Sequence, residues 1–246
     1  MDKLLTFGLV AALANIVGGY WLTSRRRISP GLLARFVGLG AGFMLAAAFL
    51  EVIPAAVGLW PDRVEVAMGL ILAGYLLLQF FEHTVVPHFH LGEETHPHAL
   101  LDSRAMVAAV SGLAMHTFFD GVSIAAGFLI DVHLGLLIFI AIVLHKIPDG
   151  VTVASIVLAS GRSKRLAQYA TLVVGGTTLV GVVAMALVQG SVGIALPLSA
   201  GVTLYIAASD LIPEVNKEEG RFISLVVFAG VALFYSTDRL IEAVGL

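Results

Sequence analysis

The sequence predicts an all-α membrane protein with eight transmembrane helices. Of the 246 residues, 59% are hydrophobic and 13% are charged, and the mean hydropathy is +0.97. A soluble domain carries about 25% charged residues. A helix that crosses the hydrocarbon core needs about 20 apolar residues, and turn or charge clusters divide this chain into segments of that length.

The first apolar segment follows Asp2 and Lys3 and precedes three arginines at 25–27. Because it lacks a clear small-x-small cleavage site, we interpret it as a transmembrane helix and not as a signal peptide. Sequences such as WPDR, IDVH, GRSKR, QGSVG and NKEEGR separate the later segments. The eight predicted helices are about 4–23, 32–59, 65–86, 104–130, 133–160, 166–189, 192–215 and 221–243. The short loops predict a single transmembrane domain over residues 1–246.

Lysines and arginines gather on one side of this predicted bundle. Ten of the 14 lie in the odd-numbered connections or beside them, namely Arg25, Arg26, Arg27, Arg35, Arg104, Arg162, Lys164, Arg165, Lys217 and Arg221. Cytoplasmic loops carry the excess of Lys and Arg. We therefore expect both termini to be external and the His-bearing loop 82–103 to be cytoplasmic.

The fourth and fifth segments contain the same motif. His116-Thr-Phe-Phe-Asp120-Gly in the fourth recurs in the fifth as His145-Lys-Ile-Pro-Asp149-Gly. The four-residue spacing places each imidazole and its carboxylate on one helix face. Ionisable residues inside a membrane cost about 2.5 kcal/mol or more each and usually mark an ion or proton path. Since the two segments are antiparallel, we expect Asp120 level with His145 and Asp149 level with His116.

These four side chains predict a binding site for a divalent metal. Zinc accepts nitrogen and oxygen ligands in a tetrahedral arrangement, and iron(II), manganese(II) and cadmium(II) suit the same donors. The chain has no cysteine, which excludes thiolate ligands. Gly121 and Gly150 follow the predicted ligands, and we expect them to let the fourth and fifth helices approach closely.

A weaker repeat links the second and seventh segments at one constant offset. It aligns Gly42, Glu51 and Pro54 with Gly201, Asp210 and Pro213. Inverted repeats are typical of secondary transporters, although such short patterns can also recur by chance in apolar sequence. We expect the prolines to free backbone carbonyls, because proline has no N–H to donate. The carbonyls expected to be free are those of Leu50 before Pro54, Ser209 before Pro213 and Leu144 before Pro148, which lies beside the ligands.

Other polar residues have a functional and a structural interpretation. Glu51 and Asp210 are candidates for acidic stations at the entrance and exit of a cation path, or they cap their helices. Asp131 and His133 could meet incoming metal, or they form a turn. We interpret Lys146 as a tethered cation that replaces a second metal and pairs with Asp149 or Asp120; the alternative is contact with a helix carbonyl.

Two further groups of polar residues are predicted outside this site. Asn15 and Gln79 are expected to form hydrogen bonds between helices. The loop histidines could bind metal loosely, but we do not expect transport to need them. They are His83, His88, His90, His96 and His98.

With these motifs, the chain resembles the ZIP (Zrt/Irt-like) family of divalent metal transporters. The resemblance rests on H-x-x-x-[DE]-G at His116 and H-[EK]-x-P at His145. It implies eight helices in a 3+2+3 arrangement with inverted repeats, external termini, and uptake of zinc or a similar metal towards the cytoplasm. It also implies that a block with helices four and five moves against one with helices two and seven. Two departures, Thr117 for the usual Asn and Lys146 for a carboxylate, favour one metal per site.

Three functions fit these residues to different degrees. The repeats and the acidic residues at both ends favour a metal importer, because an intramembrane zinc hydrolase needs neither. An exporter differs from an importer only in direction. We therefore predict a transporter with no catalytic residues and no resident cofactor, zinc being the cargo. Uptake should fall as protons compete for the imidazoles, whose ordinary pKa is about 6.5. We expect a bacterial inner membrane protein whose partners are divalent metal ions and the lipid bilayer, with a homodimer as a candidate assembly and no nucleic-acid partner.

Overall fold

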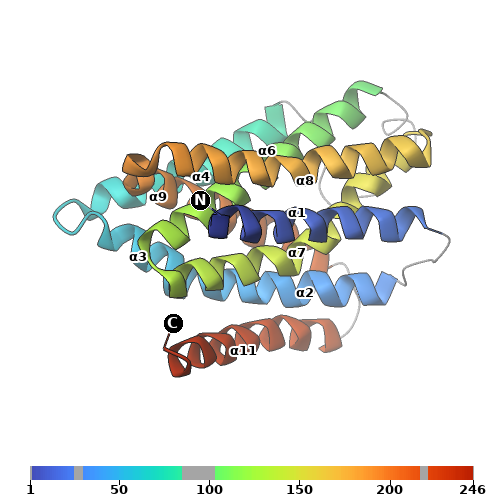
Figure 1. Ribbon diagram of the computed structural model, residues 1–246. Coiled ribbons are helices and arrows are strands. Elements are labelled where there is room, and N and C mark those ends of the chain that lie inside the picture. The colour runs from blue at the N-terminus through green and yellow to red at the C-terminus, as the bar shows by residue number, and fades with distance from the viewer. Residues whose placement is uncertain (1, 25–29, 85–102, 217–220, 246) are drawn as a thin grey trace.

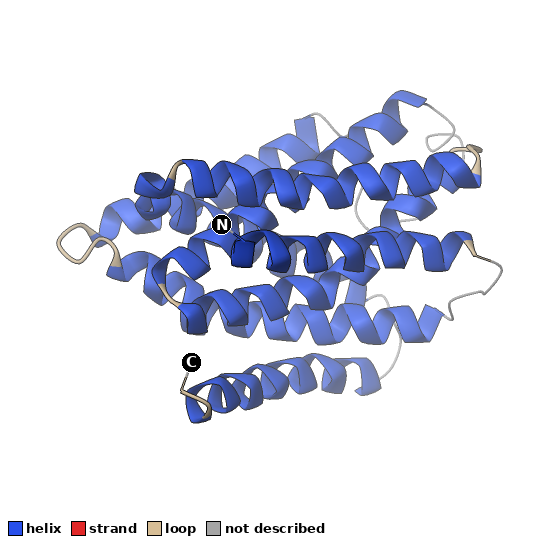
Figure 2. Ribbon diagram, viewed as in Figure 1, coloured by secondary structure: helices blue, strands red, loops and turns tan. Residues whose placement is uncertain are grey.

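The computed structural model describes residues 2–24, 30–84, 103–216 and 221–245. These residues form helices joined by short turns, with no strand among them (Figures 1 and 2). Eight helical stretches are long and apolar enough to cross a membrane, which confirms the predicted fold class. The 3+2+3 arrangement and the external termini stay predictions.

Six of the eight stretches are single α-helices, and two combine helices of different pitch. The single helices are α1 (Asp2–Thr23), α4 (Val64–Thr84), α6 (Ser103–Ile130), α7 (Val132–Ala159), α8 (Lys164–Leu187) and α11 (Arg221–Ala243). The second stretch comprises α2 (Pro30–Ala47), a π-helical turn (Ala48–Val52) and α3 (Ile53–Gly58). The seventh comprises a 3₁₀ turn (Gln189–Ser191), α9 (Val192–Tyr205), a π-helical turn (Ile206–Leu211) and α10 (Ile212–Asn216).

The two π-helical turns lie directly before the prolines of the weaker repeat, Pro54 and Pro213. Ile53 donates its backbone N–H to the carbonyl of Ala48, and Ile212 donates to Ala207. Both bonds connect a residue with the fifth before it, and the two turns align at the offset of the repeat. Because proline cannot continue the ordinary ladder, the chain widens into a π-turn before it. By contrast, α7 remains one helix through its internal proline.

Glycines mark the closest crossings of the helices that surround the site. Where α1 crosses α7, a Cβ on Gly18 would overlap the carbonyl of Ile147, and one on Gly150 would overlap that of Asn15. Small residues allow backbones to approach this closely in membrane proteins. The crossing is shared equally, since each helix contributes one glycine and one carbonyl.

The crossing of α8 with α6 repeats this arrangement. Gly181 faces the carbonyl of Phe118, and Gly121 faces that of Thr178. The prediction that Gly121 and Gly150 bring the fourth and fifth helices together is therefore wrong, because each glycine faces a different helix. The contacting residues of α6 and α7 match each other at the same offset as the His/Asp motif. Those of α8 and α1 also match each other at one constant offset. The two pairs, which run in opposite directions to each other, thus pack alike, as an inverted repeat predicts.

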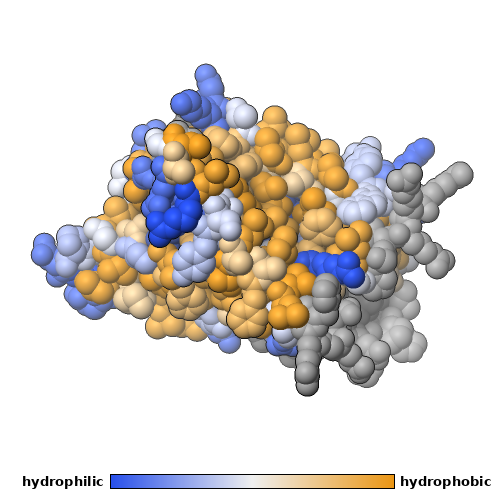
Figure 3. All heavy atoms as spheres, turned by 90° about the horizontal axis from the view of Figure 1, so that it is seen from below, coloured by the Kyte–Doolittle hydropathy of each residue, from blue (hydrophilic) through white to orange (hydrophobic). Residues whose placement is uncertain are grey.

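The other helices pair in the same manner. Gly42 of α2 and Gly230 of α11 face carbonyls of each other's helix, and so do Gly201 of α9 and Gly74 of α4. Large apolar side chains are exposed on the outer faces, among them Leu72, Phe80, Leu225 and Phe228. Figure 3 shows apolar side chains across most of one such face. This surface suits a lipid environment, and the chain is an integral membrane protein.

Candidate metal centre

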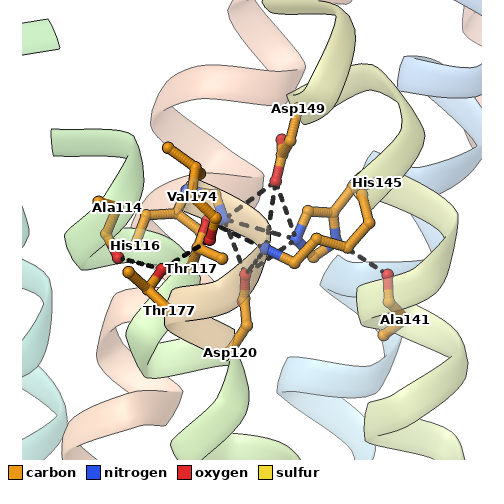
Figure 4. A network of polar contacts seen from close by, with 10 residues as sticks. Ala114, His116, Thr117, Asp120, Ala141, His145, Asp149, Val174 and Thr177 are labelled. Carbon is orange, nitrogen blue, oxygen red and sulfur yellow. Dashed lines mark hydrogen bonds and ion pairs between the residues drawn. The ribbon is translucent and has the colours of Figure 1, made fainter. Parts of the chain in front are cut away.

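The four predicted ligands meet between α6 and α7. His116, Asp120, His145 and Asp149 each offer one ligand atom, and these atoms all lie within 4.8 Å of one another. None of the four residues is more than 4% exposed. Figure 4 shows the two imidazoles and two carboxylates converging from facing helices. The helical spacing of four and the antiparallel packing together produce this arrangement.

The four ligand atoms lie close together, and both carboxylates are nearer to His116 than to His145. Asp120 Oδ2 lies 3.1 Å from His116 Nε2 and 3.5 Å from His145 Nε2. Asp149 Oδ2 lies 3.5 Å from His116 Nε2 and 3.8 Å from His145 Nε2. The two Nε2 atoms are 3.5 Å apart. Two nitrogens and two oxygens therefore surround one point, the donor set that zinc accepts in tetrahedral sites.

A backbone hydrogen bond orients one of the imidazoles. His145 Nδ1 lies 2.9 Å from the carbonyl oxygen of Ala141. Because a carbonyl only accepts, the proton of the neutral ring resides on Nδ1, and Nε2 presents its lone pair to the centre. Partners of this kind are a common feature of histidine metal ligands, since they fix the tautomer and ring orientation.

Lys146 lies within the same cluster and is fully buried. Its Nζ is 2.5 Å from Asp120 Oδ2, 3.5 Å from Asp149 Oδ2 and 3.2 Å from Thr117 Oγ1. These contacts agree with the predicted ion pairing and not with the alternative of a helix carbonyl. The role of Lys146 in place of a second metal stays a prediction, and so does the binding of a metal by the four ligands.

A cavity leads from this cluster to one end of the bundle. Its lining residues are Glu82, Ala109, Gly112, Leu113, His116, Asp149, Thr152, Ile206, Asp210 and Leu211. Asp210 therefore lies on a route to the centre, at the side that the charge bias predicts to be cytoplasmic. Sequence reasoning missed Glu82 as a lining residue. The sequence signal for Glu82 was a carboxylate at the end of an apolar segment, which we grouped with the His-bearing loop. Tyr205 Oη donates a 2.9 Å hydrogen bond to Glu82.

The opposite end of the bundle has a different group of polar residues. His133 Nε2 of α7 lies 2.9 Å from Asp238 Oδ1 of α11, and Glu51 is close enough to interact electrostatically with both. Asp131 Oδ2 accepts the N–H of Leu134 and caps α7, which supports its structural interpretation. Asp238 was not identified from the sequence, since nothing local distinguishes a partner so far along the chain from His133.

The remaining predicted residues have varied outcomes. His88, His90, His96 and His98 lie outside the described residues, and His83 is in the last turn of α4 without a described side chain. The prediction for Asn15 is wrong: its amide is fully buried and has no hydrogen-bond partner in the described part of the chain. It lies instead against the glycine-lined crossings of α1, where there is little room for a polar partner.

This fold and cluster define an integral membrane protein with a buried site suited to a divalent metal. The family model described as "ZIP Zinc transporter" matches residues 88–238, and the chain belongs to the ZIP family.

Relatives from a bacterium and from animals are named as zinc transporters. The zinc transporter ZupT of Escherichia fergusonii is 26% identical over 223 residues, which cover 87% of this chain and 86% of that protein. The zinc transporter ZIP13 homolog of Drosophila melanogaster is 33% identical over 52% of this chain and 39% of its own length. The mouse zinc transporter SLC39A7 is 31% identical over 47% of this chain and 27% of its own length. The chain thus spans only about a quarter to two fifths of these last two proteins.

Proposed function

We propose that this protein transports zinc, or a divalent metal of similar chemistry, across the membrane towards the cytoplasm. The observation that carries the proposal is the buried cluster of two imidazoles and two carboxylates at the end of a cavity. Membership of the ZIP zinc transporter family supports zinc as the cargo. Iron(II), manganese(II) and cadmium(II) are further candidates on ligand chemistry.

In this proposal His116, Asp120, His145 and Asp149 hold the metal during its passage. The cavity lined by Asp210 is the proposed exit for the metal. The inverted packing of α1 with α7 and of α8 with α6 would allow the site to alternate between the two sides of the membrane. Release to the cytoplasm follows if the Lys- and Arg-rich end is internal. We propose the inner membrane of a bacterium as the location, which similarity to ZupT supports; a homodimer stays a prediction.

The deciding experiment is zinc and cadmium uptake by liposomes that contain the purified protein. We expect uptake by the wild type and a loss of about 100-fold or more in His145→Ala and Asp120→Ala, since each removes a metal ligand. His90→Ala in the loop is the matched control and should transport normally. Uptake by His145→Ala at the wild-type rate would refute the site. Tight zinc binding by the wild type without flux would refute transport and favour the intramembrane hydrolase.

A further inference from the structure

Lys146 uses the same oxygen atoms that a metal would use. Its Nζ contacts Oδ2 of both carboxylates, and those Oδ2 atoms also face the two imidazole Nε2 atoms. Zinc binds carboxylate oxygen at about 2.0–2.2 Å. An ammonium 2.5 Å from that oxygen of Asp120 would then lie less than about 5 Å from the ion, and two positive charges so close in a buried site repel each other and compete for the oxygen.

A displaced ammonium has somewhere to go. The lysine side chain has a flexible four-carbon stem, and Thr117 Oγ1 already accepts a hydrogen bond from Nζ at 3.2 Å. Thr117 is the residue that replaces a more common metal ligand in the helix-four motif. A small movement of Nζ towards this hydroxyl would release Asp120 Oδ2 while keeping the ammonium buried and bonded.

The charge of the cluster explains why a resident cation is useful. Two ionised carboxylates and one ammonium carry a charge of −1 when no metal is bound and +1 with a divalent ion. Without the lysine, the corresponding values are −2 and 0. The cost of holding net charge in a medium of low dielectric constant rises steeply with the charge. Removing the lysine therefore eases movement of the loaded site and hinders movement of the empty one.

We propose that Lys146 is the resident cation of the empty transport site. The incoming metal displaces its ammonium from Asp120 Oδ2, and the ammonium takes that oxygen back after the metal leaves. The empty protein thus returns to its outward-facing state without a cotransported or counter-transported ion. This proposal rests on the proposed transport function and adds a mechanism for the return step.

Lys146→Met tests the proposal because it removes the cation and retains the length of the side chain. We expect net zinc uptake to fall about tenfold or more, because net uptake requires return of the empty site. Exchange of internal for external zinc should stay within about twofold of the wild type, because exchange needs only the loaded form. Zinc affinity should rise by at least about tenfold, since a like charge near the ion is removed. Lys164→Met at the start of α8 is the matched control and should change none of these rates.

Each outcome separates this proposal from the proposed function. A wild type without uptake or exchange refutes transport itself. A wild type that transports, with net uptake and exchange reduced equally in folded, zinc-binding Lys146→Met, overturns the resident cation alone. Lys146→Gln replaces the methionine variant if the latter does not fold.

A second measurement needs only the wild type. If zinc crosses alone, each ion carries two charges, and the reversal potential should shift by about 30 mV for a tenfold zinc gradient. A smaller shift, or uptake that depends on a proton gradient, would overturn the proposal.

Discussion

Glu51 and Asp210 occupy equivalent positions in the two π-helical turns, yet their surroundings differ. The two residues align in the weaker repeat, and both turns contain the same type of π-helical backbone hydrogen bond. Asp210 lines the cavity that reaches His116 and Asp149, whereas Glu51 lies outside it, near the pair formed by His133 and its α11 partner. Equivalent sequence therefore does not imply equivalent access to the centre.

The same difference extends along the two site helices. On α6, the cavity is lined by Ala109, Gly112 and Leu113. The equivalent α7 residues in the motif repeat are Ile138, Ala141 and Ile142, and none of these is more than 3% exposed. Among the described residues, the cavity therefore reaches the site along α6 and Asp210 and is not lined by the equivalent residues of α7. For an inverted repeat, we expect the outward-open state to exchange these surroundings between the halves.

The largest expected effect is on the reactivity of engineered cysteines. The natural chain has no cysteine, so an engineered cysteine is the only thiol that the reagent can label. A membrane-impermeant thiol reagent should label Leu113→Cys about 100-fold faster than Ile142→Cys in metal-free protein in detergent, because labelling of the buried position requires opening. Mass spectrometry of the intact protein measures both rates. Equal rates would mean that the two halves do not differ in access.

The two acidic residues should affect different kinetic parameters. Asp210→Asn is expected to lower the maximal uptake rate about tenfold, because the released metal loses an attractive carboxylate on its way out. Glu51→Gln should instead raise the apparent KM severalfold, because Glu51 attracts metal on the entrance side. Uptake as a function of zinc concentration distinguishes the two. An identical effect of both variants would remove the functional difference between the halves.

Sequence patterns predicted what depends on local spacing and missed what depends on distant partners. Hydropathy indicated the eight spans, and the four-residue spacing of His116 and Asp120 indicated the cluster. Pro54 and Pro213 indicated a disturbed ladder but not that a π-turn would accommodate it. The small size of Gly121 indicated a close crossing without naming the helix that it faces.

Residues at helix ends were the least predictable part of the candidate site. Glu82 and Asp238 each look like an ordinary polar end of an apolar segment. Their importance comes from Tyr205, 123 positions away from Glu82, and from His133, 105 positions away from Asp238. Only the packing of α4 on α9 and of α7 beside α11 brings these partners together.

Breaking the His133–Asp238 pair should moderately increase access to the site from the end of the bundle at which this pair lies. The pair joins α7 to α11, and Asp238 is only 7% exposed. Loss of a hydrogen bond of this kind costs roughly 1 kcal/mol. Asp238→Asn in the Ile142→Cys background should therefore increase labelling of the cysteine roughly fivefold. Arg239→Gln, which removes a different and exposed ion pair on the same helix, is the control; an equal increase in both variants would argue against a specific role of His133 and Asp238.

The loop histidines should have the smallest effect of all. His88, His90, His96 and His98 follow α4 in the sequence and lie outside the described residues. Replacing all four by serine removes candidate ligands but none of the four buried donors between α6 and α7. We expect zinc uptake to change by less than about twofold, while weak zinc binding at the loop, measured by calorimetry, is lost. A tenfold loss of uptake would mean that metal release depends on capture by the loop, and the cavity at Asp210 would then be only part of the exit.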